Sequence, residues 1–307
     1  MKCINKWICL SLLIAVSCVS GCGKTSAAIE QPYDVYATAA DFGLSSNGTA
    51  EAKSYFASDL CVSEDVAIGT DSTDSQVAEG AGTFNLETNT VVYAKNLYER
   101  LYPASTTKIL TAYIALKYCD DLDAMVTVSE NAVNQASDSS VCNLKAGDVI
   151  RLRDLLYGLM LRSGNDAAVA IAEYISGDVD SFAALMNQEA AAMGATRSHF
   201  VNPNGLPDEN HYTCVYDMYL IFSNAIKNDT FVSIIGTTSY DVTYTDASGE
   251  AVTHTWENTN QYLTGNATTP DGFQIVGGKT GTTGEAGYCL VLYSYNPSGQ
   301  PIISIVF

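Results

Sequence analysis

Three short motifs follow one another along this chain and contain the residue types that acyl transfer through a serine ester requires. They are Ser-Thr-Thr-Lys at 105–108, Ser-Gly-Asn at 163–165 and Lys-Thr-Gly-Thr at 279–282. Each motif alone is weak evidence, because a serine three residues before a lysine occurs by chance in many helices. Together they supply a nucleophile, a base, a proton relay and a cation that can bind an anion.

The first motif places a hydroxyl and an amine on one face of a predicted helix. Residues three apart are neighbours on a helix surface, so Lys108 can reach Ser105. A serine hydroxyl needs a base, and a lysine can act as that base if burial or a neighbouring cation lowers its pKa. Lys279 of the third motif is the candidate cation. The start of a helix would also favour the negative charge that develops on Ser105.

The second motif lies between two predicted helices, in a turn that exposes polar side chains. We expect the Ser163 hydroxyl to relay a proton between Lys108 and the leaving amine. The side-chain amide of Asn165 can hold a lysine and a substrate carbonyl at the same time. Asp166 follows directly, but capping of the next helix explains it as well as catalysis does, so it is left out of the predicted site.

The third motif follows an apolar strand and two glycines. A strand edge with free N–H groups can pair with an extended peptide substrate, and the side chains of Lys279 and Thr280 can bind a carboxylate. Gly281 allows the backbone to come close to its neighbours. We predict that the backbone N–H groups of Thr282 and Ser105 form the oxyanion hole.

Histidines, metals and cofactors have no predicted part in this chemistry. The three histidines, His199, His211 and His254, are too scattered for a Ser-His-Asp triad, so we expect structural roles for them. The chain also lacks a Cys-x-x-Cys pair, which leaves zinc or thioredoxin-like chemistry without support. The predicted site is therefore a serine–lysine site with no metal and no cofactor.

The elements around the motifs change type twice along the chain. Alternating apolar residues predict a β-hairpin over 83–94, and a helix follows over 105–118. Residues 151–225 show helical periodicity, and over 236–307 the period returns to two. This order predicts an α+β fold, in which an antiparallel sheet is flanked by helices and carries an inserted all-helical lobe.

The N-terminus is predicted to be a targeting segment. A basic start with Lys2 and Lys6 precedes a short apolar run, Trp7–Val19, which ends shortly before Cys22. Small residues before a cysteine at that distance resemble a bacterial lipoprotein signal, in which the cysteine receives the lipid. An ordinary cleaved secretory signal is the alternative.

Composition divides the chain into a signal peptide (1–21), a flexible tether (22–58) and a catalytic domain (59–307). The tether is rich in Ala, Ser, Thr and Gly and has few apolar residues in register. The chain has 15 basic and 34 acidic residues, and its net charge of −19 should repel nucleic acid and anionic lipid headgroups. The predicted location is extracytoplasmic, with attachment to the bacterial cell membrane through a lipid on Cys22.

Nine cysteines are present, and five remain when the signal peptide and the lipidated cysteine are set aside. The five are Cys61, Cys119, Cys142, Cys214 and Cys289. Five free thiols are the favoured interpretation of this odd number, and one disulfide of undetermined pairing is the alternative.

Beyond the three motifs, the chain resembles the low-molecular-mass penicillin-binding proteins, which are serine D-Ala-D-Ala carboxypeptidases of the S11 peptidase family. The resemblance covers roughly 83–307. It includes Tyr-Pro-Ala-Ser-Thr-Thr-Lys at 102–108, Leu-Arg-Ser-Gly-Asn-Asp-Ala-Ala at 161–168, Asn-Pro-Asn-Gly-Leu-Pro at 202–207 and Trp-Glu-Asn-Thr-Asn at 256–260. It implies the β-lactamase/transpeptidase-like version of the α+β fold.

The resemblance also implies roles for single residues. Ser105 would be the acylated nucleophile and Lys108 its base, and Ser163 would complete the catalytic set. Lys279 and Thr280 would bind the terminal carboxylate of the substrate. The implied reaction removes the terminal D-Ala from peptidoglycan stem peptides through a serine acyl-enzyme, and β-lactam antibiotics would acylate the same serine.

Two features differ from the family pattern. The chain stops at Phe307, inside the last predicted strand, where the family continues with a helix, so its C-terminal end is expected to be truncated. No arginine follows Arg197, although related enzymes often supply one to the carboxylate. Recognition of the carboxylate would then depend on Lys279, Thr280 and Thr282, or on residues beyond the terminus.

Two other functions remain open at this point. A β-lactamase of the same fold would need a carboxylate that directs water onto the acyl-enzyme, usually in a Glu-x-x-Leu-Asn loop. This chain has Asn-Gly-Leu-Pro at 204–207 in the corresponding region, and Glu209 matches poorly. The other candidate is a non-catalytic cell-wall-binding lipoprotein. Nitrocefin turnover tests the first alternative, and labelling by a fluorescent penicillin tests the second.

Overall fold

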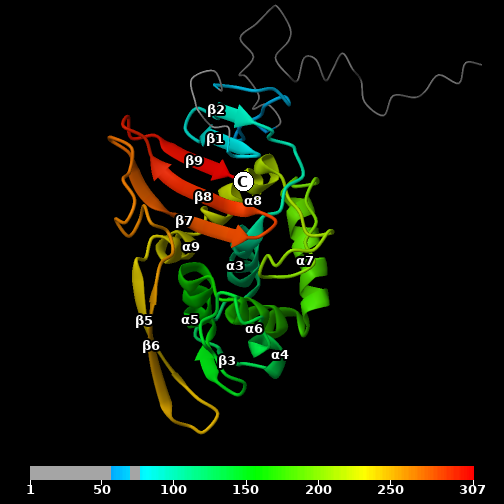
Figure 1. The fold of residues 1–307 in the computed structure, drawn as a ribbon, viewed down its shortest axis with the longest axis vertical. Coiled ribbons are helices and arrows are strands. Elements are labelled where there is room, and N and C mark those ends of the chain that lie inside the picture. The colour runs from blue at the N-terminus through cyan, green and yellow to red at the C-terminus, as the bar shows by residue number, and fades with distance from the viewer. Residues whose placement is uncertain (1–56, 70–76) are drawn as a thin grey trace, which may run out of the picture. The chain divides into compact units, whose positions relative to one another are not determined.

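The computed structural model describes residues 57–69 and 77–307, and Asp59–Phe307 forms one compact unit. The predicted signal peptide, Cys22 and nearly all of the predicted tether lie outside the described residues. Within the compact unit, antiparallel sheets combine with helices (Figure 1), which confirms the α+β class.

The larger sheet has five strands and carries the third motif at its edge. In spatial order the strands are β2 (Thr90–Lys95), β1 (Ala81–Asn85), β9 (Pro301–Val306), β8 (Gly287–Tyr295) and β7 (Gln274–Thr283). Side-chain amides close its tight turns: the Asn85 side-chain oxygen accepts the backbone N–H of Glu87 at 3.0 Å, and that of Asn296 accepts from Gln300 at 2.9 Å. Strand β7 has no strand beyond it in this sheet, and it contacts the turn η2 (Ala104–Thr107), which contains Ser105.

A smaller second sheet lies in the lobe that was predicted to be entirely helical. Its strands are β3 (Met125–Thr127), β4 (Val149–Arg151), β5 (Ser239–Thr245) and β6 (Ala251–Glu257). The β5–β6 hairpin was predicted from its alternation, but it pairs with β4 rather than with the larger sheet. Strands β3 and β4 were missed, because three residues are too few to show a period of two.

Helices fill the space between the sheets. They are η2 (Ala104–Thr107), α3 (Lys108–Tyr118), α4 (Glu130–Val133), α5 (Leu152–Tyr157), η3 (Gly158–Arg162), α6 (Asn165–Ser176), α7 (Val179–Ala192), α8 (Val215–Ala225) and α9 (Asp229–Ile235). The predicted helix over 105–118 begins as a 3-10 turn and continues as an α-helix, and η3 is a π-helical turn. The short α4 and α9 were not predicted.

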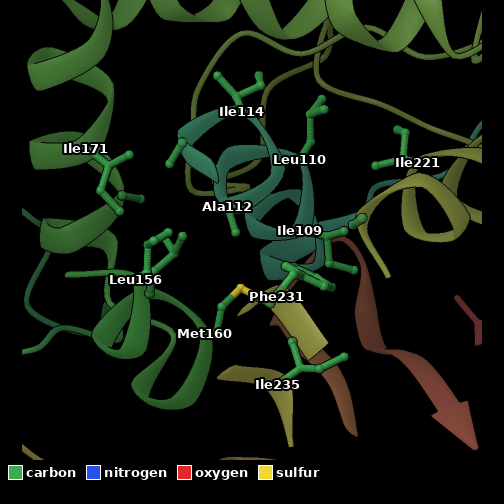
Figure 2. Packing of buried hydrophobic residues seen from close by; sticks show 14 of the residues in the cluster. Ile109, Leu110, Ala112, Ile114, Leu156, Met160, Ile171, Ile221, Phe231 and Ile235 are labelled. Atoms are coloured by element: carbon green, nitrogen blue, oxygen red, sulfur yellow. The ribbon is translucent and has the colours of Figure 1, made fainter. Parts of the chain in front are cut away.

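Helix α3 is the centre of the hydrophobic core (Figure 2). Ile109, Leu110 and Ile114 are fully buried on different sides of it, so the helix is covered by neighbours on more than one face. Contacts with α6, α7, α8 and α9 surround it. This packing gives the Lys108 end of α3 a fixed place against η2 and β7.

The five cysteines of the compact unit are all free thiols, so the predicted set of unpaired cysteines is confirmed. Four of them are buried, and Cys119 is half-buried. No disulfide therefore links the described elements, and the unit depends on its hydrophobic core for stability.

Candidate active site

Ser105 lies in the 3-10 turn η2, directly ahead of α3. The residue before it, Ala104, has a φ of +47°, a left-handed conformation that costs a non-glycine residue about 1 kcal/mol or more. Gly205 packs against this turn so closely that a Cβ there would lie 1.8 Å from the Ala104 carbonyl oxygen. The surrounding packing thus holds Ala104, directly before Ser105, in a conformation that the local sequence alone would not favour.

Lys108 is completely buried, and its amine has three oxygen neighbours. Its Nζ lies 2.8 Å from Oγ of Ser105, 2.8 Å from Oδ1 of Asn165 and 2.7 Å from the Asn204 carbonyl oxygen. A neutral amine has one lone pair and two N–H groups. It can accept the serine O–H while it donates to the other two oxygens, which is the arrangement that a general base needs.

The electrostatics of the site favour that neutral amine. Burial holds the pKa of Lys108 well below its usual value, and the nearby charge of Lys279 lowers it further. Cys142 and Asp166 act in the opposite direction, but they are the smaller influences. The expected cation next to the base is therefore present.

Ser163 ends the π-helical turn η3, and its φ of +62° is again unusual for a residue with a side chain. Its Oγ accepts a hydrogen bond of 3.0 Å from the Lys279 amine. The next helix, α6, begins at Asn165, whose side-chain oxygen contacts Lys108. Ser163 and Asn165 thus connect the two lysines, Ser163 to Lys279 and Asn165 to Lys108.

Asp166 hydrogen-bonds to the backbone of the segment over 142–144 and has no contact with Ser105 or Lys108 among its hydrogen bonds. Its buried carboxylate accepts the backbone N–H groups of Cys142 and Ala167, and it also accepts that of Leu144. The N–H of Asn165 donates to the carbonyl oxygen of Ser140. The structural interpretation of Asp166 therefore fits its contacts.

Lys279 lies on β7 and is 1% exposed. Its amine donates to Ser163 and, at 2.7 Å, to the carbonyl oxygen of Thr280. Burial lowers its pKa to about 7. The hydroxyl of Thr280 is 2.6 Å from that of Thr259, and the Thr282 hydroxyl donates to the Gly281 carbonyl oxygen at 2.8 Å.

Gly281 brings the edge of β7 against the nucleophile turn. A Cβ at this position would lie 3.0 Å from the backbone nitrogen of Ser105 and 3.2 Å from the carbonyl oxygen of Pro103. The backbones of β7 and η2 therefore run side by side next to Ser105. The oxyanion hole formed by the N–H groups of Ser105 and Thr282 stays a prediction that this proximity permits.

Ser105 lines two clefts, which have volumes of about 430 Å³ and 370 Å³. Hydroxyl and aromatic groups line the larger one, among them Ser163, Thr259, Tyr262, Thr280 and Tyr288. Polar and acidic groups line most of the smaller one, among them Asp138, Ser139, Asn165, Asn204 and Glu285. Ser140 and Thr282 line both clefts.

The structure thus brings all eight predicted active-site residues to one place, and it adds contributors that were not predicted. Asn204 contributes a backbone carbonyl, and no residue type announces such a role in a sequence. Ser140 and Tyr288 come from a loop and from β8, which have no recognisable motif. Thr259 lies in the Trp-Glu-Asn-Thr-Asn stretch, so the resemblance marked its region without giving it a role.

The described residues contain no group of three or more His, Cys, Asp or Glu side chains that could hold a metal ion. His211 is buried against η2, whereas His199 and His254 lie in partly exposed positions on the loop before α8 and on β6. None of the three histidines lies within hydrogen-bonding contact of Ser105.

Known proteins are similar to this chain in sequence and in fold. The sequence profile of the D-alanyl-D-alanine carboxypeptidase family, peptidase S11, matches residues 69–307. The D-alanyl-D-alanine carboxypeptidase DacF of Bacillus subtilis is 34% identical over 235 residues, which are 75% of this chain and 57% of DacF. The D-alanyl-D-alanine carboxypeptidase of Streptomyces sp. strain K15 is 36% identical over 239 residues, 75% of this chain and 80% of that protein.

Solved structures agree with these sequence matches. The crystal structure of the Streptomyces K15 DD-transpeptidase superimposes with a TM-score of 0.70 at 34% identity, covering 76% of this chain and 91% of that one. That of DacD from Francisella tularensis gives a TM-score of 0.67 at 29% identity, covering 80% and 68%. The chain spans little more than half the length of several relatives, such as DacF. It belongs to the peptidase S11 family of D-alanyl-D-alanine carboxypeptidases.

Proposed function

We propose that this protein is a serine-type D-alanyl-D-alanine carboxypeptidase that removes the terminal D-Ala from peptidoglycan stem peptides. The observation that carries the proposal is the contact between Ser105 and Lys108. The buried amine lies 2.8 Å from the serine oxygen and has acceptors for both of its remaining protons. Family membership and the names of the relatives support the same reaction.

The geometry supports a two-step reaction. The Lys108 amine takes the proton of Ser105 as Oγ attacks the carbonyl carbon before the terminal D-Ala. Backbone N–H groups of Ser105 and Thr282 stabilise the oxyanion, which is typically worth a few kcal/mol for each donor. As the bond to D-Ala breaks, Ser163 passes its proton to the leaving amine and takes up the proton that Lys108 received from Ser105, which leaves Lys108 neutral for the next step. Water then hydrolyses the ester and restores Ser105.

The two clefts accommodate the two sides of the bond that breaks. An extended peptide can pair with the outer edge of β7, which places its scissile carbonyl beside Ser105. The leaving D-Ala would then occupy the hydroxyl-lined cleft, where the hydroxyls of Thr280 and Thr282 donate to its carboxylate near the Lys279 cation. A penicillin would present its own carboxylate to the same groups and would acylate Ser105.

A fluorescent penicillin tests this assignment directly. Wild-type protein should be labelled at Ser105 and should release D-Ala from a peptide that ends in D-Ala-D-Ala. Ser105→Ala should abolish both activities without loss of the fold, measured by its melting temperature. Labelling of the Ser105→Ala protein would overturn the assignment, and an unlabelled wild type would favour a non-catalytic wall-binding role.

Two related activities are separated by further measurements. Rapid, continuous turnover of nitrocefin would indicate a β-lactamase. Glu209 is exposed and is absent from the lining of both clefts, so it does not supply the carboxylate that such turnover requires. One relative is named both as a carboxypeptidase and as a DD-transpeptidase. Addition of an amine acceptor would show whether water or an amine resolves the acyl-enzyme here.

We further propose that a lipid on Cys22 attaches the protein to the outer face of the bacterial cell membrane. The basic start, the short apolar run and the small residues before Cys22 support this proposal. Within the part of the chain that the structure describes, none of the helices has the length and apolar character needed to cross a bilayer. Cys22→Ala should release the protein from membranes, and a mutant that stays bound after signal cleavage would contradict the proposal.

A further inference from the structure

One buried histidine lies outside the three motifs but contacts the turn that carries the nucleophile. The His211 side chain is 1% exposed, and its Nε2 lies 2.9 Å from Oγ1 of Thr107, the residue before Lys108. Its Nδ1 accepts the backbone N–H of Val201 at 3.1 Å. A neutral imidazole that accepts at Nδ1 carries its proton on Nε2, so His211 donates to the Thr107 hydroxyl.

The contacts of His211 join two ends of one loop to the catalytic turn. The loop over 201–211 supplies the Asn204 carbonyl oxygen, which lies 2.7 Å from the Lys108 amine. A Cβ on Gly205 of this loop would lie only 2.9 Å from Oγ1 of Thr107, so the loop and the turn are in direct contact. The loop therefore covers the Lys108 amine, and the hydrogen bonds of the imidazole hold the loop against the turn.

We propose that His211 is a positioning residue for acyl transfer, which fastens the 201–211 loop to Thr107 and thereby keeps Lys108 dry and in reach of Ser105. The inference rests on the proposed function, because it concerns the same reaction. His211 does not touch the reacting atoms and acts through the loop and the turn.

The charge state of His211 suits this role. Burial lowers its pKa to about 4, and the charges of His199 and Lys108 lower it further, while Asp208 opposes them. The ring is therefore neutral near pH 7 and keeps the one tautomer that can both accept from Val201 and donate to the turn.

The loop matters for the pKa of the base. Burial is the largest influence that lowers the pKa of Lys108, ahead of the charge on Lys279, and Cys142 and Asp166 raise it. If the loop opens, water reaches the amine and its pKa rises toward the usual range. A smaller fraction of Lys108 is then neutral at pH 7, and acylation slows. The rising limb of the pH–rate profile moves to higher pH.

The test is the pH dependence of acylation by a fluorescent penicillin, measured on the full chain. Thr107→Val removes the hydroxyl at nearly constant volume, and His211→Ala removes the ring. Each should slow acylation about tenfold at pH 7 and move the rising limb up by about one pH unit. The double variant should be no slower than either single one, because both changes break the same contact.

Two control variants separate positioning from a general loss of structure. His211→Gln keeps a donor for the Thr107 hydroxyl. Its acylation rate should therefore be close to that of wild type, and the rising limb of its pH–rate profile should lie at the wild-type pH. His254→Ala, on the distant hairpin strand β6, should change neither. Folding of each variant is checked by its melting temperature, and if His211→Ala does not fold, Thr107→Val decides.

Three results would overturn the inference. One is a folded Thr107→Val variant in which the rising limb of the pH–rate profile lies at the same pH as in wild type. Another is a slower rate with an unmoved limb and no rescue by His211→Gln, which would show a merely structural histidine. The third is a wild type that no penicillin labels. In that case the proposed function itself fails. If wild type is labelled and the variants behave like wild type, only the inference on His211 fails and the proposed function stands.

Discussion

The two buried lysines of the site occupy different kinds of structure and have different partners. Lys108 starts the central helix α3, and its amine contacts the nucleophile and two acceptor oxygens. Lys279 lies in the edge strand β7, and its amine contacts Ser163 and a backbone carbonyl. In the proposed mechanism, the different positions of the two amines therefore make Lys108 the base and Lys279 the cation beside the leaving group.

Their charges depend on each other. Two ammonium groups in one buried site repel, so the second proton is held less tightly than the first. Burial lowers the pKa of both lysines, but Lys279 also lowers that of Lys108. The arrangement favours a neutral Lys108 beside a Lys279 that still carries a proton on part of the molecules near pH 7.

The largest expected effect comes from removing the base. Lys108→Met keeps most of the buried volume but takes away the amine that accepts the serine proton. Acylation by penicillin should fall by about 10³-fold, within the range that a general base contributes. Stopped-flow labelling measures the loss. A rate within tenfold of wild type would show that another group, such as Lys279, serves as the base.

The next effect concerns the close contact of β7 with η2. In Gly281→Ala, the new Cβ would meet backbone atoms of Ser105 and Pro103 that cannot swing away. The strand or the turn must shift, which should disturb the oxyanion hole and slow acylation about 10²-fold. Gly284→Ala is the matched control, because a Cβ there meets nothing within 4 Å. Equal rates for both variants would refute the predicted geometry of the hole.

The sequence alone identifies some residues of this site and not others. Motif spacing identified both lysines, Ser105 and Ser163, because their chemistry depends on side chains with recognisable types. The sequence could not show that Asn204 contributes a carbonyl, since every residue has one. It also hid the left-handed conformations of Ala104 and Ser163, which tertiary packing imposes against local preference.

The fold was predictable for similar reasons. Alternation identified the β1–β2 hairpin and the strand-forming region 236–307, and helical periodicity identified α3 and the helical region 151–225. The three-residue strands β3 and β4 form because the β5–β6 hairpin gives β4 a partner that is distant in the chain. Such pairing has no local signal, and for this reason the lobe was expected to be entirely helical.

A smaller effect concerns the contribution of Lys279 to the pH dependence of stability. The pKa of Lys279 is about 7 in the folded protein, below the value of about 10.4 for a free lysine. Between these values the unfolded chain binds more protons than the folded one, so the free energy of unfolding rises with pH. Wild type should gain about 2 kcal/mol between pH 7 and pH 9 from this group.

Lys279→Met should remove that part of the pH dependence. Urea unfolding at pH 7 and pH 9 measures it, and the comparison uses the difference between the two pH values within each protein. Lost hydrogen bonds shift the variant's stability equally at both pH values and so cancel. A variant with the full wild-type slope would show that Lys279 keeps its usual pKa.

The smallest expected effect concerns the hydroxyls beside Lys279. The Thr280 hydroxyl is 2.6 Å from that of Thr259 and lines the larger cleft, where it can donate to a substrate carboxylate. A hydrogen bond to a charged group typically contributes about 1.5 kcal/mol or more, so Thr280→Val should reduce the preference for a free C-terminal acid over its amide about tenfold. Rates of D-Ala or D-alaninamide release from the two peptides measure this preference. Thr253→Val is the matched control, because its hydroxyl also pairs with a threonine hydroxyl, that of Thr243 at 3.0 Å, but on the exposed hairpin. If Thr280→Val keeps the full preference, the carboxylate is recognised by Lys279 and Thr282 without the Thr280 hydroxyl, and Lys279 differs even more sharply from Lys108 in what it binds.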